Sequence, residues 1–352
     1  MDAPRLEFLR RLIDAPSPSG YEQATRQVWH ETVSVFADHV HTDLHGNVIA
    51  SRNPDGNPRL MFAGHCDELG LQINYIDDNG FLYFNTIGGH DPSLVPGRRV
   101  IVHATDGPVR GVTGRRAVHL TPRDQRGKAQ KIEDIWIDIG VEDKDAVEEL
   151  IRVGDPVTYD LGMQDLRNGQ AVARAFDNKI GAWVVAEALR RINGESCTAA
   201  VFSVATVQEE IGLRGATTSA FGVDPLVGVA VDVTHATDHP NVNKVTAGDV
   251  SLTGGPVITR GANVNPVVER LLMESAEALD MKVQVEAEPR GTGTDANTIQ
   301  LTRGGVATGL VSVPLRYMHT PSEIISLDVA DQAADLLAEF AQRLTPEMDF
   351  TP

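Results

Sequence analysis

The sequence predicts an α/β fold in which a central, mostly parallel mixed sheet is covered by helices on both faces and a small antiparallel β domain is inserted. Two observations predict it. Near-continuous β-branched runs alternate with amphipathic helical stretches in residues 1–69 and 166–352, as in a sheet covered on both faces. Residues 70–165 instead hold short alternating segments joined by Asn-Gly and Asp-Gly turns, which are typical of antiparallel hairpins.

The first part of the chain predicts two helices and two strands. We expect helices at 5–15 (RLEFLRRLIDA), where leucines recur at helical spacing, and at 21–36 (YEQATRQVWHETVSVF), which opens with polar residues. We expect strands at 47–52 (NVIASR) and 59–65 (RLMFAGH), joined by the turn sequence NPDGNP. The second strand brings His65 to its end.

The middle segment predicts hairpins and one short helix. Alternating strands are expected within 71–89, 98–114 and 132–141, and the helix within 143–153. No helix between these strands is long enough to cross a sheet. We therefore expect a separate β module inserted into the α/β domain.

The last part of the chain completes the α/β pattern. Its apolar runs and amphipathic stretches alternate at the lengths expected for strands and helices. The predicted helices are 178–192, 265–280 and 329–344, and the predicted strands are 199–207, 226–233, 282–288 and 305–314.

Composition and charge limit the function. The chain has 352 residues, 41% of them hydrophobic, and a net charge of −18. Nucleic acids and anionic membranes bind basic surfaces, so this charge argues against both as partners. No apolar stretch could span a bilayer, and the N-terminus lacks the apolar core of a signal peptide. Because Cys66 and Cys197 are also too few for a disulfide framework, we expect a cytoplasmic protein.

Metal-ligating residue types follow the predicted strands and open one predicted helix. Carboxyl ends of parallel strands meet at one edge of a sheet, so these side chains are expected to converge there. Singly they have structural explanations, such as a helix N-cap for Asp177 or a satisfied loop histidine for His319. Together they would repel one another without cations, and mixed nitrogen and oxygen ligands suit zinc, cobalt or manganese. The set comprises His65, Cys66, Asp67, Glu68, Asp177, Glu209, Glu210, Asp232, His235 and His319.

The adjacent carboxylates Glu209 and Glu210 end the strand sequence VATVQEE. Neighbouring side chains on a strand point to opposite faces, so we expect the two glutamates to have different roles. In a two-metal site, one can bind a metal while the other accepts a proton from the attacking water. Adjacent glutamates do not suit a glycosidase, whose two carboxylates lie roughly 5 to 9.5 Å apart across a sugar bond.

Six motifs along nearly the whole chain resemble those of the TET-type co-catalytic metalloaminopeptidase family: GHCDE, AFDNK, VQEEIGLRGA, VDVTHA, GTGTDA and MHTPSE. The family includes glutamyl and deblocking aminopeptidases, and some relatives are labelled endoglucanase. The resemblance implies a zinc-exopeptidase-like α/β domain with an inserted β domain for dimerisation and as a lid. It also implies a homo-oligomer, in which dimers assemble into a tetrahedral dodecamer.

The resemblance implies a role for seven of these residues, which become the candidate site residues. It implies two divalent ions per subunit, with zinc or cobalt favoured over manganese. Glu209 would be the general base, and Asp67 would orient His65 or tune its metal. The implied metal ligands are His65 and Asp232 on one ion, Glu210 and His319 on the other, and Asp177 as the bridge.

The implied function is a metal-dependent aminopeptidase that hydrolyses N-terminal residues from short peptides. Two alternatives stay open. A β-1,4-glucan hydrolase would need aromatic platforms for sugar rings, whereas none of the three tryptophans lies in the motifs. A non-catalytic self-assembling particle would be favoured by a missing ligand or base, and none is missing. The preferred N-terminal (P1) residue also stays open, including whether Arg290 favours acidic side chains or is a surface arginine.

Overall fold

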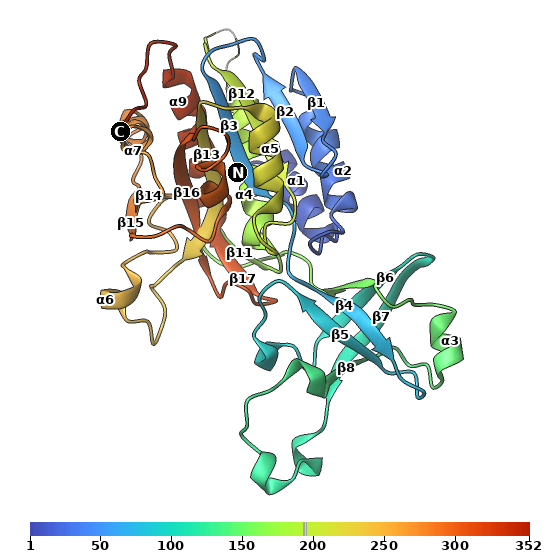
Figure 1. Ribbon diagram of the computed structural model, residues 1–352. Helices are drawn as coiled ribbons and strands as arrows, with labels where there is room; N and C mark the ends of the chain where they lie inside the picture. The colour runs from blue at the N-terminus through green and yellow to red at the C-terminus, as the bar shows by residue number, and fades with distance from the viewer. Residues whose placement is uncertain (193, 195) are drawn as a thin grey trace.

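The computed structural model describes residues 1–192, 194 and 196–352. Its larger part, at the top of Figure 1, is an 11-stranded sheet with helices around it. The main path through this sheet is β1, β2, β12, β3, β13, β16, β17, β11 and β10; β14 pairs with β16, and β15 with β14. The strands are β1 (His39–Thr42), β2 (Val48–Arg52), β3 (Arg59–His65), β10 (Gln164–Asp165), β11 (Gln170–Ala173), β12 (Ala200–Thr206), β13 (Val227–His235), β14 (Val257–Gly261), β15 (Gln284–Glu288), β16 (Ala307–Arg316) and β17 (Glu323–Ser326).

The parallel centre of the sheet determines where the candidate residues meet. Strands β12, β3, β13 and β16 are parallel neighbours and almost wholly buried, which explains their near-continuous apolar sequences. Thr206, the last residue of β12, lies opposite His65, the last residue of β3. The outer strands β1, β2, β17, β11 and β10 pair antiparallel, so the sheet is mixed.

Helices cover both faces of the sheet, which confirms the predicted fold class (Figure 1). Leu60 and Phe62 of β3 belong to a core that includes residues of α1, α2, α4, α7 and α9. Met61 and Ala63, on the opposite face of the same strand, pack in a core with α5 and α8. The helices of this part are α1 (Ala3–Asp14), α2 (Gln23–Val33), α4 (Phe176–Arg191), α5 (Arg214–Val223), α6 (Lys244–Ala247), α7 (Pro266–Ala278), α8 (Asp295–Ile299) and α9 (Leu327–Arg343).

The smaller sheet, below the larger one in Figure 1, closes into an antiparallel barrel in the order β4, β5, β8, β7, β6 and β9, with its own apolar core. Barrel strands run from Gly70 to Tyr159, whereas β10 at Gln164–Asp165 pairs in the large sheet. The division into domains at residues 70–165 stays a prediction. The elements of this part are β4 (Gly70–Ile76), β5 (Leu82–Ile87), η1 (Pro92–Leu94), β6 (Arg99–Ala104), β7 (Gly107–Arg115), η2 (Val118–Leu120), η3 (Arg123–Gln125), η4 (Ile132–Asp134), β8 (Ile135–Asp138), α3 (Lys144–Glu148) and β9 (Pro156–Tyr159).

Several elements of the large sheet and its helices were not predicted, namely β1, β10, β11, β14, β17, α5, α6 and α8. The sequence of α5, RGATTSAFGV, contains Gly and Thr residues that are poor helix formers, and its helix depends on packing against the sheet. Both cysteines are buried free thiols. Within the described residues, no helix is long and apolar enough to cross a membrane.

Candidate metal centre

Six of the seven candidate residues line one cleft at the carboxyl edge of the parallel strands. The cleft has a volume of about 920 Å³. Strands β3 and β13 contribute one ligand candidate each, the turn after β12 contributes two, and the start of α4 and the β16–β17 loop contribute the others. Asp67, the seventh, is fully buried, with its Oδ1 3.4 Å from Nδ1 of His65. The six lining residues are His65, Asp177, Glu209, Glu210, Asp232 and His319.

Asp177 lies between the two histidines. Its Oδ1 is 3.3 Å from Nε2 of His65, and its Oδ2 is 3.2 Å from Nε2 of His319. The same nitrogen of His319 is 3.7 Å from Oε2 of Glu210. The backbone of Asp177 is non-helical, with φ −77° and ψ 105°, although it lies at the start of α4. One carboxylate with one oxygen toward each of two imidazoles is suited to bridge two cations.

The carboxylates around His65 form two groups of potential metal ligands, and His65 belongs to both. In each group the three potential ligand atoms lie within 4.8 Å of one another. One group is His65 with Asp177 and Glu210, and the other is His65 with Glu209 and Asp232. Nε2 of His65 is 3.6 Å from Oε2 of Glu209 and 3.9 Å from Oδ1 of Asp232. The cluster therefore extends to both sides of the Asp177 carboxylate.

The expectation that Glu209 and Glu210 point to opposite faces of a strand is wrong. Strand β12 ends at Thr206 and Gln208 has a left-handed φ of 55°, so the strand alternation stops before the pair. Asp67 holds this turn, because its Oδ1 accepts the Glu209 N–H at 3.0 Å and its Oδ2 accepts the Glu210 N–H at 3.1 Å. Both glutamate side chains consequently face the cleft.

Burial strongly perturbs the carboxyl groups of the cluster. It raises the pKa of Glu209 to about 10, and it raises the pKa values of Glu210 and Asp232 well above their usual range. Burial acts in the same direction on Asp177, but hydrogen bonds to both histidines hold the pKa of that carboxyl below its usual value. Nearby cations stabilise the charged form of buried carboxyl groups such as these.

The donor set fits divalent cations. Oε1 of Glu210 is buried and has no hydrogen-bond partner among the described residues, and a cation would provide one. Imidazole nitrogens combined with carboxylate oxygens suit zinc, cobalt and manganese, whereas calcium prefers oxygen alone. This part of the cleft could therefore hold such ions.

Comparison with known proteins shows the family. The sequence profile of the M42 glutamyl aminopeptidase family matches residues 46–336. This chain belongs to the M42 family. A lysyl aminopeptidase of Pyrococcus furiosus is 35% identical over 350 residues, which cover 98% of this chain and 99% of that protein.

Two solved structures of similar proteins share the whole fold. The TET aminopeptidase of the marine sediment archaeon Thaumarchaeota archaeon SCGC AB-539-E09 has a TM-score of 0.92 and 32% identity, covering 97% of this chain and 96% of its own. The Pyrococcus horikoshii TET1 peptidase can assemble into a tetrahedron or a large octahedral shell. Its structure has a TM-score of 0.85 and 29% identity, and the match covers 97% of this chain and 100% of its own. Family membership confirms the predicted enzyme class, a metal-dependent aminopeptidase.

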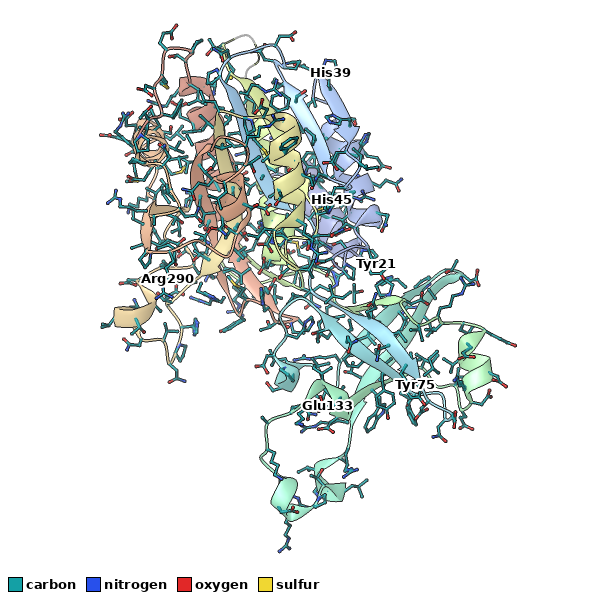
Figure 2. All side chains as sticks on the ribbon, in the orientation of Figure 1. Tyr21, His39, His45, Tyr75, Glu133 and Arg290 are labelled. Carbon is teal, nitrogen blue, oxygen red and sulfur yellow. The ribbon has the colours of Figure 1, made fainter. Side chains whose placement is uncertain are left out.

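The walls of this M42 cleft are acidic and lack the aromatic platforms of a glucan hydrolase. Among the described residues, no Trp, Tyr, Phe, Lys or Arg lines the cleft, whereas Glu286 and Glu288 do. Trp29 and Trp183 are fully buried in the core. Arg290 is exposed and is not among the lining residues; it follows the end of β15, at the left of the larger part in Figure 2.

Two residues that form hydrogen bonds to the candidate site residues of this M42 centre were not predicted from the sequence. Ser19 donates a hydrogen bond to Oδ2 of Asp67 at 2.6 Å, and Glu323 accepts the backbone N–H groups of Asp177 and His319, each at 3.0 Å. Glu323 belongs to the motif MHTPSE, which was a usable signal. Ser19 lies in PSPSG, a segment that offers no such signal.

Proposed function

We propose that this M42 aminopeptidase releases N-terminal residues from short peptides with two divalent ions per subunit, zinc or cobalt in preference to manganese. The observation that carries the proposal is the position of Asp177, with one carboxylate oxygen toward His65 and the other toward His319. A single-metal site would leave one of these imidazole–carboxylate pairs without a cation.

We assign the ligands to the two ions by their proximity to the histidine on each side of Asp177. The proximity of Asp232 to His65 supports one ion on those residues, and the proximity of Glu210 to His319 supports the other. Asp177 would be shared by both ions. Asp67 would act through its neighbours, because it contacts the far nitrogen of His65 and holds the backbone of both glutamates.

When bound, two such ions supply Lewis acidity that activates a water molecule and polarises the scissile carbonyl group. Glu209 would accept the proton of the attacking water and deliver it to the departing amine. It is 7% exposed and lies on the His65 side of the cleft, with its Oε2 free of any hydrogen bond from the described backbone. Neighbouring cations would favour its carboxylate form, so that it can act as a base near neutral pH.

The acidic cleft would also select a free peptide N-terminus. A positively charged α-amino group is attracted to the carboxylates of the lining, while a blocked N-terminus loses this attraction. We further propose a cytoplasmic homo-oligomer in which dimers form a tetrahedral dodecamer. The tetrahedron that the similar Pyrococcus horikoshii TET1 peptidase can form supports this proposal.

Metal reconstitution tests the function. Chelator-stripped protein would be assayed on aminoacyl-p-nitroanilides and on matched free and N-acetylated peptides, with zinc, cobalt or manganese added singly. We expect stepwise release of N-terminal residues from the free peptides only, restored by at least one metal. Chelator-insensitive cleavage of a β-1,4-glucan, or folded metal-loaded protein without peptidase activity, would contradict the proposal.

A further inference from the structure

The carboxyl group of Glu323, at the start of β17, lies behind the candidate metal centre and takes no part in the chemistry above. The residue is 2% exposed. Its Oε2 accepts the N–H of Asp177 and its Oε1 accepts the N–H of His319, both at 3.0 Å. One carboxylate therefore fixes the backbone of the bridging residue and of a terminal ligand that is distant in sequence.

Both N–H groups need this acceptor because of the local backbone. Asp177 lies in the non-helical first residues of α4, where N–H groups have no partner within the helix. His319 has a φ of 59°, in the left-handed region that non-glycine residues rarely adopt, and lies in the loop between β16 and β17. An N–H group that is removed from water and has no acceptor destabilises the folded state, so Glu323 stabilises both conformations.

These two conformations determine where the ligand atoms lie. The carboxylate of Asp177 faces His319 with one oxygen and His65 with the other, so a shift of its backbone would alter both contacts. Metal–ligand distances tolerate changes of only about 0.2 Å. A residue that fixes the backbone of two ligands at once is thus in a position to control metal affinity.

The barrel also contacts His319, together with Glu210. A Cβ atom placed on Gly88 would lie 3.5 Å from Oε2 of Glu210, and one placed on Gly89 would lie 3.4 Å from Nδ1 of His319. The loop after β5 therefore packs directly against two ligand candidates of one ion. His319 is thus in contact with this loop through its ring and with Glu323 through its backbone N–H.

We propose that Glu323 is a positioning residue that holds Asp177 and His319 in the register needed by the ion on the His319 side. This proposal rests on the two-metal function proposed above. Loss of one of its two acceptor oxygens should weaken binding of that ion by about 10- to 100-fold, the usual effect of removing a partner that orients a ligand. Binding of the ion on the side of His65 and Asp232 should weaken less, because Glu323 holds only one of its ligands, the shared Asp177.

The variant Glu323→Gln tests this directly. Its amide oxygen can accept one N–H, but its NH₂ group would face the other as a second donor. Glu286→Gln is a matched control, because Glu286 also accepts two hydrogen bonds, from the hydroxyl groups of Thr234 and Thr259 at 2.6 and 2.7 Å, and lines the same cleft without holding a ligand candidate. Zinc affinities of both sites would be measured by competition with a chromophoric chelator, alongside the stability of the metal-free proteins.

We expect Glu323→Gln, but not Glu286→Gln, to weaken zinc binding on the His319 side more than on the His65 side. Adding Glu323→Gln to His319→Ala should cause little further loss of zinc affinity on the His319 side. Wild-type affinities in Glu323→Gln, or equal losses in both variants, would overturn the positioning role. If Glu323→Gln does not fold, Glu323→Asp replaces it, because its side chain is one methylene too short to reach both N–H groups. The same loss of zinc affinity is expected, and wild-type affinities would again overturn the positioning role. A wild-type protein that binds only one ion would instead refute the two-metal function.

Discussion

Substitution of Glu209 by Gln should stabilise the metal-free protein increasingly as the pH rises. In the folded protein, burial raises the pKa of Glu209 from 4.5 to about 10. The folded state therefore keeps a proton that the unfolded chain releases near pH 4.5, so that rising pH favours unfolding throughout the window between these two values. Glutamine has no such proton to lose.

The magnitude follows from proton linkage. One proton difference changes the free energy of unfolding by about 1.4 kcal/mol per pH unit. Between pH 5 and pH 8, the stability advantage of Glu209→Gln over the wild type should therefore grow by up to roughly 4 kcal/mol. Urea denaturation in the presence of a chelator, repeated at intervals of one pH unit, measures this difference.

Three results test this reasoning about Glu209. Saturating zinc should abolish the growing advantage, because nearby cations favour the carboxylate that only the wild type has. With zinc bound, the variant should lose about 10²- to 10⁴-fold in kcat while both ions remain. A stability difference that stays constant from pH 5 to pH 8 would refute the reasoning, since Glu209 would then be ionised in the metal-free fold.

Three further variants or substrates test other parts of the structure. Gly64→Ala places a Cβ atom 2.4 Å from the backbone carbonyl carbon of Gly181, where β3 packs against α4. It should therefore lower the free energy of unfolding by about 1–3 kcal/mol, measured by urea denaturation. An unchanged denaturation midpoint would contradict this close contact. Asp67→Asn should reduce zinc affinity or kcat by about 10- to 100-fold. Wild-type values for both would show that Asp67 does not support the metal ligands. Lysyl-p-nitroanilide should have a kcat/KM roughly fivefold above that of the glutamyl substrate, which corresponds to one charge contact of about 1 kcal/mol. The reason is that Glu286 and Glu288 line the cleft, whereas no Lys or Arg does among the described residues; the reverse preference would refute this.

The position of the cluster could be predicted from sequence because it depends on local patterns and one topological rule. The apolar sequence RLMFAGH coincides with β3, and its end places His65 at the carboxyl edge of the sheet. The ends of β12 and β13 follow the same rule, which brings Glu209 and Asp232 to that edge. No long-range information was needed beyond the presence of a parallel sheet.

The orientation of the side chains could not be predicted in the same way. The direction of Glu209 depends on the left-handed Gln208 and on hydrogen bonds to Asp67, which lies 142 residues away. The role of Glu323 depends on hydrogen bonds to backbone groups of Asp177 and His319, a contact between loops that no periodicity reports. Closure of the barrel likewise depends on pairing of β9 with both β4 and β6.

Anomalous diffraction at the zinc edge from zinc-loaded crystals tests the central claim most directly. The account predicts two peaks, one on each side of the Asp177 carboxylate, with one beside Nε2 of His65 and the other beside Nε2 of His319. A single peak in fully active protein, or zinc bound away from Asp177, would contradict it.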